Sequence, residues 1–290
     1  MNKTNTVLTI AVQKSGRLQN GSTKLLEEAG FSLANGSSRA LKSRATNFPL
    51  ELLYLRDDDI PSCVAEGVAD AGIVGENAVA ESEQSVDIVD RLGFARCRLA
   101  VAVPRDSRFE TVEDLQGKSI ATSYPVILRR FLKSRGVEAA IRTISGSAEI
   151  TPSIGVSDAV CDLVSTGSTL MVNGLREIET VMTSEAVMIG GPSPNPQKKA
   201  LLDRVQFRMR SVLGARDYKY ILLNCPNGQI ARITEILPGI KSPTVMPLAT
   251  EGWSSVHTVV REDEFWEIID ALKENGAEGV LVLPIQKLVF

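Results

Sequence analysis

Residues 157–170, with the sequence SDAVCDLVSTGSTL, combine two carboxylates with a run of small hydroxyl side chains. Asp158 and Asp162 are four residues apart, and both are expected to point outward from a short strand and the turn that follows it. The turn itself consists of Ser165, Thr166, Gly167, Ser168 and Thr169. Such a turn offers backbone N–H groups and hydroxyls to a ligand, and its glycine allows close approach. This favours a phosphate in the turn, with sugar hydroxyls on the two carboxylates.

The same residue types also occur in ordinary turns, and pairs of aspartates are usually solvated. The order of the groups distinguishes the two interpretations. Two acids followed directly by a glycine-containing hydroxyl turn favour phosphoribose over phosphate alone. We call residues 165–169 the hydroxyl turn.

In its detail the stretch resembles the phosphoribosyl-diphosphate loop of phosphoribosyltransferases. Followed by Asn173-Gly174-Leu175, it is similar to the signature of the ATP phosphoribosyltransferase family. The resemblance runs through essentially the full length of the chain. It implies transfer of phosphoribosyl from phosphoribosyl diphosphate to N1 of ATP, with release of pyrophosphate, in the first step of histidine biosynthesis. It also implies Mg²⁺ that accompanies the substrates, for which the resemblance names no protein ligand. It further implies dimers that assemble into hexamers.

A second candidate site follows the apolar run at residues 7–12. The sequence continues into a polar turn in which two cations surround a serine and a glycine: Lys14, Ser15, Gly16 and Arg17. Ligands of open α/β sheets bind at the carboxyl ends of strands, so this turn is a candidate site for a polyphosphate, although solvated charges are the usual alternative. We expect these four residues to bind ATP, together with Asp70, Gly72, Gly75, Arg98 and Tyr124. Glu149 is expected to act with Asp158 and Asp162 as a catalytic acid, unless it is a surface acid.

The order of apolar and polar segments predicts an α/β chain. By resemblance its catalytic part has the two-lobed fold of periplasmic binding proteins, with lobe I at residues 1–98 and 179–214 and lobe II at residues 99–178. Residues 178–181 and 186–189 are both expected to be strands that return to lobe I. From residue 217 the predicted order βαββαβ is typical of a ferredoxin-like (ACT-like) domain, which we place at residues 215–290.

The terminal domain is expected to be regulatory. The resemblance implies a site for free histidine as feedback inhibitor, formed by Asp217, Ser242, Thr244 and Leu248. The alternative is that Ser242-Pro243-Thr244 only turns the chain into a strand.

Composition excludes several other classes of protein. The chain of 290 residues has a net charge of −3, which argues against a nucleic-acid surface. It has no apolar run of the roughly 20 residues that span a bilayer. Residues 7–12 lack the features of a signal peptide, so we expect a cytoplasmic protein. The single histidine argues against a Ser-His-Asp triad and against a multi-histidine zinc site, and the four cysteines form no CxxC pair that would indicate a metal site.

Three other functions remain open on the sequence alone: a solute receptor, the effector domain of a transcription regulator, and a regulatory subunit without activity. The missing signal peptide and the absence of a helix-turn-helix segment disfavour the first two. The intact hydroxyl turn disfavours the third. The sequence departs from the family pattern at residues 81–89 and 190–196, which we expect to lie away from the site.

Overall fold

A computed structural model describes residues 6–34, 41–191, 195–237 and 239–289. Contacts divide the chain into two compact units: residues 1–27 and 31–204 form the first, and residues 28–30 and 205–290 form the second. The division falls inside the helix α6 (Pro196–Ala215). No helix among these described residues is long and apolar enough to cross a membrane. Residues 192–194, in the irregular stretch expected at 190–196, lie outside the described part.

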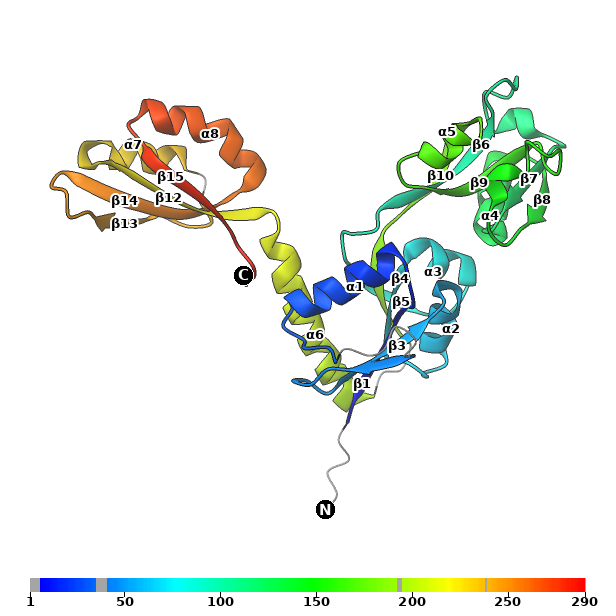
Figure 1. Ribbon diagram of the computed structural model, residues 1–290, viewed down its shortest axis with the longest axis horizontal. Helices are drawn as coiled ribbons and strands as arrows, with labels where there is room; N and C mark the ends of the chain where they lie inside the picture. The colour runs from blue at the N-terminus through cyan, green and yellow to red at the C-terminus, as the bar shows by residue number, and fades with distance from the viewer. Residues whose placement is uncertain (1–5, 35–40, 192–194, 238, 290) are drawn as a thin grey trace, which may run out of the picture. The chain divides into compact units, whose positions relative to one another are not determined.

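The first unit contains two sheets, and its first sheet has six strands in the order β2-β3-β1-β4-β11-β5 (Figure 1). Its central strand β1 has four side chains with no exposed surface, as expected for a strand covered on both faces. The strands are β1 (Leu8–Gln13), β2 (Lys42–Arg44), β3 (Leu50–Leu55), β4 (Ala71–Gly75), β5 (Asp87–Arg91) and β11 (Ala186–Gly190). The helices between these strands are α1 (Arg17–Glu28), α2 (Ile60–Ala65) and α3 (Glu76–Ser82).

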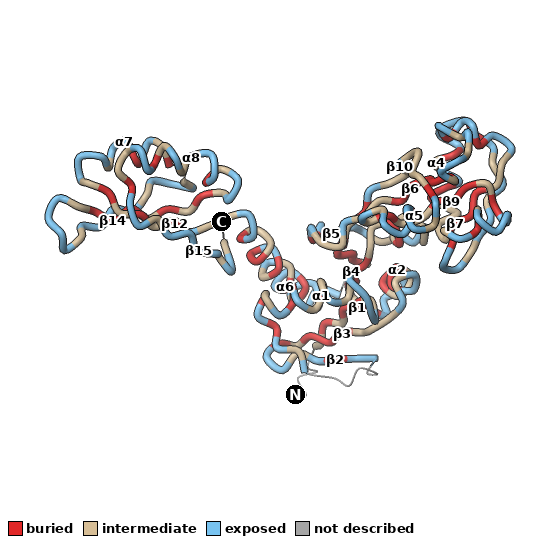
Figure 2. Tube along the Cα trace, turned by 45° about the horizontal axis from the view of Figure 1, so that its top comes forward, coloured by how far each residue is buried: buried red, intermediate tan, exposed pale blue. Residues whose placement is uncertain are grey.

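The second sheet has five strands in the order β10-β6-β9-β7-β8. They are β6 (Cys97–Pro104), β7 (Ser119–Thr122), β8 (Ala140–Thr143), β9 (Ala159–Val164) and β10 (Leu175–Ser184), and the helices are α4 (Pro125–Arg135) and α5 (Ser168–Val172). Figure 2 shows that burial is concentrated along the central strands. The expectation that residues 178–181 return to lobe I is wrong, because β10 pairs with β6 to its last residue. Only β11 joins the first sheet.

One hydrogen-bond arrangement begins a parallel strand pair in each sheet. In the first sheet Asp70 donates its N–H to the carbonyl of Thr9 (2.9 Å), and its carboxylate accepts the N–H of Thr9 (2.8 Å). In the second sheet Asp158 donates to the carbonyl of Ser119 (2.9 Å) and accepts the Ser119 N–H (2.8 Å). We call this two-way exchange the aspartate brace. The motif G-V-x-D-A at residues 67–71 and 155–159 carries it in both sheets.

The brace corrects the expected positions of Asp158 and Asp70. Each residue precedes a strand and lies at its amino end, whereas the turns that follow β9 and β4 lie at the carboxyl end. Four residues of extended chain separate Asp158 from Asp162, which corresponds to about 13 Å. Asp158 also accepts a hydrogen bond from the Ser119 hydroxyl (2.8 Å), and Asp70 pairs with Lys198 (3.0 Å). Both carboxylates therefore fix strands, and we assign neither to a ligand.

The second unit contains a four-stranded sheet in the order β13-β14-β12-β15. Its strands are β12 (Tyr218–Pro226), β13 (Thr244–Pro247), β14 (Trp253–Arg261) and β15 (Glu278–Pro284). Its helices α7 (Ile230–Ile236) and α8 (Glu262–Glu274) lie on the same face of the sheet (Figure 1). The buried side chains of Ile221, Leu223, Val256, Phe265 and Leu272 form the core between them. This is the βαββαβ order and strand arrangement of a ferredoxin-like domain.

The aspartate brace gives a prediction about stability. The Asp158→Asn substitution weakens hydrogen bonds to a partly exposed charged acceptor, so we expect it to lower the free energy of unfolding by about 1 kcal/mol. The Ser119 N–H keeps the pKa of Asp158 below its ordinary value. The stabilisation is therefore complete above the unfolded pKa of about 4 and is lost as the pH falls through the lower folded pKa.

Urea unfolding of the parent and of Asp158→Asn, repeated at acid and neutral pH, measures this contribution. Asp106→Asn, on an exposed turn, is the control and should leave the free energy of unfolding unchanged. If Asp158→Asn kept the stability of the parent but lost turnover, the structural assignment would be contradicted, and Asp158 would instead be a residue of the reaction.

Candidate functional site

The hydroxyl turn lines a pocket of about 330 Å³ at the carboxyl end of β9. Every residue from Asp162 to Leu170 contributes to its wall, together with Glu149 and Arg17. The structure thus brings together Asp162, Glu149 and all five residues of the predicted turn. We call this the turn pocket.

The local sequence explains why the chain turns here. Val164 and Leu170 are buried on either side of the hydroxyl turn and belong to one apolar cluster, so they hold its two ends. Gly167 has a φ of +82°, a left-handed conformation that costs glycine little. Thr166 and Ser168 carry hydroxyl oxygens 3.0 Å apart, and either hydroxyl can donate to the other. The turn is therefore anchored by apolar residues while its hydroxyls remain accessible.

Arg17 brings a positive charge from the first sheet to the turn pocket. It begins α1, directly after the polar turn that follows β1, and its Nη1 donates to the Ser165 hydroxyl at 2.9 Å. Because a guanidinium matches the oxygens of a phosphate, Arg17 and the hydroxyl turn together form a suitable cradle for one.

Two carboxylates face the other side of the turn pocket. Burial raises the pKa of Asp162, and the neighbouring Glu149 carboxylate raises it further, whereas the Leu163 N–H opposes the shift by donating to Asp162 at 2.7 Å. Glu149 lies in a short 3₁₀ turn (Ala148–Ile150), and Ser147, which directly precedes the turn, has a left-handed backbone conformation. The pair places negative charge beside the position that a sugar attached to the phosphate would occupy.

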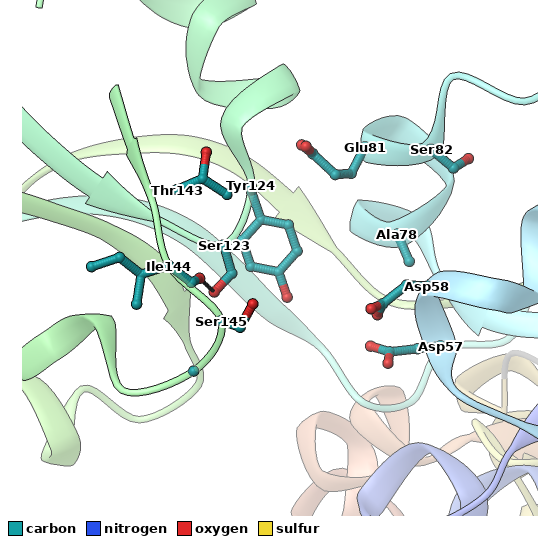
Figure 3. A pocket seen from close by; sticks show the side chains of 11 residues that line it. Asp57, Asp58, Ala78, Glu81, Ser82, Ser123, Tyr124, Thr143, Ile144 and Ser145 are labelled. Atoms are coloured by element: carbon teal, nitrogen blue, oxygen red, sulfur yellow. Dashed lines mark hydrogen bonds between the residues drawn. The ribbon is translucent and has the colours of Figure 1, made fainter. Parts of the chain in front are cut away.

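A second pocket of about 380 Å³ is lined from both sheets of the first unit. Asp57 and Asp58 follow β3 on one side, and Tyr124 and Ser145 follow β7 and β8 on the other (Figure 3). Burial and the adjacent Asp58 raise the pKa of Asp57. The pKa of Tyr124 is also raised, first by burial and then by Asp57. The phenol therefore stays protonated and can donate a hydrogen bond. We call this the tyrosine pocket.

A third pocket of about 240 Å³ shares residues with both of the others. It has Arg17 and Ser165 in common with the turn pocket, and Asp57 in common with the tyrosine pocket. Gly16, Gly75 and Asn77 also line it. A Cβ atom at Gly75 would lie 2.4 Å from the Asn77 side-chain oxygen, so the glycine makes room for this amide. The three pockets therefore adjoin one another through shared wall residues, and we refer to them together as the cleft.

Several residues of this cleft were not among the predicted site residues. Asp57 and Asp58 lie in the acidic cluster RDDDIP. This cluster directly follows a strand, where ligands of open α/β sheets bind, and its position could therefore have indicated a site. Glu81 also lines the tyrosine pocket, so the expectation that residues 81–89 lie away from the site is wrong. Nothing local marks Glu81, because the groups that it contacts are about 45 residues away along the chain.

Other predicted residues have different surroundings. Arg98 forms a bidentate ion pair with Glu177, with N–O distances down to 2.6 Å, which neutralises the charge expected to meet a phosphate. Gly72 makes room for α2, because a Cβ there would lie 2.6 Å from an Ile60 methyl group. Lys14 and Ser15 lie in the turn before Arg17 and are exposed.

The predicted histidine site is only partly assembled in one chain. Ser242 and Thr244 are close in sequence and exposed at the start of β13, and Leu248 directly follows that strand. Thr244 is level with His257 of β14 and, through it, with Leu222 of β12. Asp217 precedes Leu222 by five residues, and β12 lies two strands from β13, so Asp217 and Thr244 are about 20 Å apart. Asp217 therefore cannot share one amino-acid ligand with Thr244 of the same chain.

Comparison with known proteins identifies relatives for both units. The sequence profile of the family described as "ATP phosphoribosyltransferase" matches residues 56–211, and that of "HisG, C-terminal domain" matches residues 215–287. A protein of Cytophaga hutchinsonii named ATP phosphoribosyltransferase is 55% identical, covering 98% of this chain and 99% of the relative. One of Bacteroides thetaiotaomicron with the same name is 52% identical, covering 98% of this chain and 100% of the relative.

Among solved structures, the ATP phosphoribosyl transferase (HisG:HisZ) complex from Thermotoga maritima contains a similar chain. Its TM-score is 0.60 at 24% identity, covering 70% of this chain and 99% of that chain, and this similarity supports the fold. The sequence relatives extend over both units and carry a single name. By these matches the chain belongs to the ATP phosphoribosyltransferase family, whose enzymes are pentosyltransferases of histidine biosynthesis.

Proposed function

We propose that this chain transfers the phosphoribosyl group of phosphoribosyl diphosphate to N1 of ATP, giving phosphoribosyl-ATP and pyrophosphate. The observation that supports this best is the turn pocket, in which a hydroxyl turn and Arg17 face the carboxylates of Asp162 and Glu149. The pocket offers donors for a phosphate and acceptors for sugar hydroxyls within one cavity.

The 5′-phosphate of the donor substrate would bind in the hydroxyl turn. Thr166, Ser168 and Thr169 supply hydroxyls, and Arg17 supplies a charge that already reaches Ser165. The polar turn at Lys14, Ser15 and Gly16 continues from Arg17, so the diphosphate or the triphosphate of ATP would lie along it. Its exposed Lys14 adds positive charge where phosphates accumulate.

The ribose would lie against Asp162 and Glu149. As the bond from C1 to the diphosphate lengthens, positive charge develops on the ribose ring, and two fixed carboxylates stabilise that charge. N1 of adenine has a free lone pair and needs no base to remove a proton before it attacks C1. The chemistry therefore depends on orientation and charge, which the cleft supplies without histidine or cysteine.

The acceptor nucleotide would occupy the tyrosine pocket. The Tyr124 phenol can donate to the nucleotide, and the Asp57 and Asp58 carboxylates can accept from an exocyclic amino group or from ribose hydroxyls. The third pocket, lined by Gly16 and Gly75, connects this position with the turn pocket. N1 and C1 can then meet inside one cleft.

Mg²⁺ would accompany the phosphates of the substrates. The described residues contain no group of three or more His, Cys, Asp or Glu side chains that could hold a metal ion. Mg²⁺ commonly binds through one or two carboxylates and the oxygens of substrate phosphates, so a site completed by the diphosphate is compatible with these residues. Bound there, the ion would neutralise the leaving pyrophosphate.

Feedback inhibition by histidine is a further part of the proposal. Ser242 and Thr244 carry exposed hydroxyls in the terminal domain, which the matched profile identifies as the C-terminal domain of the family. Since Asp217 is distant from them within one chain, a site that uses all three would need a second copy. This agrees with the homo-oligomer of dimers and hexamers expected from the family.

The reaction itself can be tested directly with ATP, phosphoribosyl diphosphate and Mg²⁺. The proposal expects a change in adenine absorbance as N1 is modified, and release of pyrophosphate in equal amount. A receptor or an inactive subunit would bind ligands without either product.

Replacing one hydroxyl of the turn tests the phosphate position. Thr169→Val keeps the shape of the side chain but removes a donor to a charged group, a loss of about 1.5–3 kcal/mol. We expect the Michaelis constant for phosphoribosyl diphosphate to rise tenfold or more. Thr46→Val, on an exposed turn elsewhere, is the matched control. An unchanged constant in a folded Thr169→Val variant would rule out this position for the phosphate.

The role of Asp162 predicts both a rate and a pH dependence. Asp162→Asn removes a charge close to the reacting ribose, and we expect kcat to fall by about 10²-fold while Tm changes little. Because the folded pKa is raised, parental turnover should decline with acidification already above pH ~4, where an ordinary aspartate is still ionised.

The matched comparison for Asp162→Asn is Asp158→Asn, which should lose stability and keep its turnover per folded molecule. The opposite pattern in the pair would show that the two aspartates have been assigned the wrong way round.

Inhibition by histidine can be separated from catalysis by variants of the terminal domain. Ser242→Ala combined with Thr244→Ala removes two hydroxyls, so the histidine concentration for half inhibition should rise at least tenfold, with uninhibited turnover nearly unchanged. Thr250→Ala, exposed in the same domain, is the control. Equal inhibition of the double variant and the parent would place the effector elsewhere.

A further inference from the structure

The helix α4 receives its N-terminal cap from another helix. Its first residue is Pro125, and Tyr124 precedes it at the capping position without any hydrogen bond from its side chain to the helix. The carboxylate of Glu81, which lies in α3, accepts the N–H of Val126 (2.9 Å) and the N–H of Ile127 (3.0 Å), one on each oxygen. A carboxylate in this position satisfies two free N–H groups and complements the helix dipole.

A helix is usually capped by the residue that directly precedes it, which here would mean Tyr124 or its neighbour Ser123. Instead Ser123 donates its hydroxyl to the Ile144 carbonyl at 2.7 Å, and the Tyr124 N–H binds the Thr122 hydroxyl. Serine, threonine, aspartate and asparagine are the usual capping residues, and a tyrosine cannot replace them. Because Glu81 supplies the cap, the capping position is free to hold a side chain that lines the tyrosine pocket.

The Glu81 cap also joins the two sheets of the first unit. The helix α3 directly follows β4 of the first sheet, and α4 follows β7 of the second. Arg130 of α4 adds an ion pair with Glu83 and a contact to the Ala80 carbonyl at 3.4 Å. In Figure 3 the Glu81 carboxylate lies on the side of the pocket from which α4 starts, above Tyr124 and opposite the loops of the second sheet.

We propose that Glu81 is a positioning residue for the acceptor nucleotide, which sets the separation between Tyr124 on one wall and Asp57 and Asp58 on the other. This inference rests on the proposed function, since it assigns the tyrosine pocket to ATP. Glu81 lines the pocket itself, and its two hydrogen bonds fix the helix turn that carries Tyr124. Without the cap, Tyr124 and the opposite acids no longer have a fixed spacing.

The turn pocket predicts which substrate is affected. None of its lining residues belongs to α3 or α4, so a change at Glu81 should leave the binding of phosphoribosyl diphosphate intact. The signature of the positioning role is therefore a selective change in one of two Michaelis constants. A purely structural role would change the amount of folded protein and affect both substrates alike.

The experiment compares the full-length parent with Glu81→Ala, Glu81→Gln and Glu83→Gln under steady-state conditions. In Glu81→Ala we expect the Michaelis constant for ATP to rise about tenfold, the factor that corresponds to one lost hydrogen bond to a charged group. The constant for phosphoribosyl diphosphate should stay within twofold. Glu81→Gln retains one acceptor oxygen and should give an intermediate value, and it carries the test alone should Glu81→Ala fail to fold.

Glu83→Gln is the matched control, because it removes a mostly exposed ion pair between α4 and the residue that follows α3 without touching the cap. Both its Michaelis constants should equal those of the parent. Amide hydrogen exchange supplies a readout that does not depend on activity: Val126 and Ile127 should exchange faster in the Glu81 variants than in the parent and in Glu83→Gln.

Two results would overturn the inference: unchanged exchange at Val126 and Ile127 in the Glu81 variants, or equal effects on the two Michaelis constants, including no effect on either. An inactive parent is a different result. It would overturn the proposed function, and the exchange data would still show whether Glu81 caps α4.

Discussion

The register of two parallel strand pairs, β1 with β4 and β7 with β9, sets the positions of the Gly16–Arg17 turn and the hydroxyl turn in the cleft. The aspartate brace fixes each pair at its amino end, where Asp70 and Asp158 exchange hydrogen bonds with the neighbouring backbone. A slip of one residue would turn each strand's side chains to the opposite face. Correct register brings the turns after these strands to one edge of each sheet, as open α/β sheets require for ligand binding. The Gly16–Arg17 turn and the hydroxyl turn meet for this reason.

Features that depend on neighbouring residues could be predicted from the sequence. The hydroxyl turn assembles as predicted because its residues are contiguous, and the ferredoxin-like order of the second unit follows from local alternation of strands and helices. The spacing of Asp158 and Asp162 led to the wrong prediction that both carboxylates lie at one ligand site. Residues i and i+4 share one face of a strand, but they lie about 13 Å apart along it. The repeated motif G-V-x-D-A, present in both lobes, was the signal that both of its aspartates have the same structural role.

Contacts between distant residues could not be predicted in this way. The sequence predicts that Arg98 binds a phosphate-bearing ligand. Its guanidinium is instead held in a bidentate ion pair by Glu177, which is 79 residues away along the chain. Glu81 is inconspicuous in sequence, and its partners lie in the first turn of a helix of the other sheet. Asp217 and Thr244 lie in one domain but are separated by the order of its strands. In each case the pairing of strands, which local composition does not encode, decides the neighbour.

The hydrogen bond between Arg17 and Ser165 has a consequence for how the protein responds to salt. It joins a cation of the first sheet to a hydroxyl of the second across a solvent-exposed opening. A phosphate that entered the turn pocket would displace a neutral acceptor and give the guanidinium a charged one. Binding of the proposed ligand would thereby replace a weak bridge between the sheets with a stronger one, whose strength would depend on the ionic strength. In physiological buffer the Debye length is about 8 Å, so the attraction between the Arg17 guanidinium and a phosphate is retained at contact and largely screened at longer range. Added salt should therefore slow association of the proposed phosphate ligand more than it weakens the bound complex.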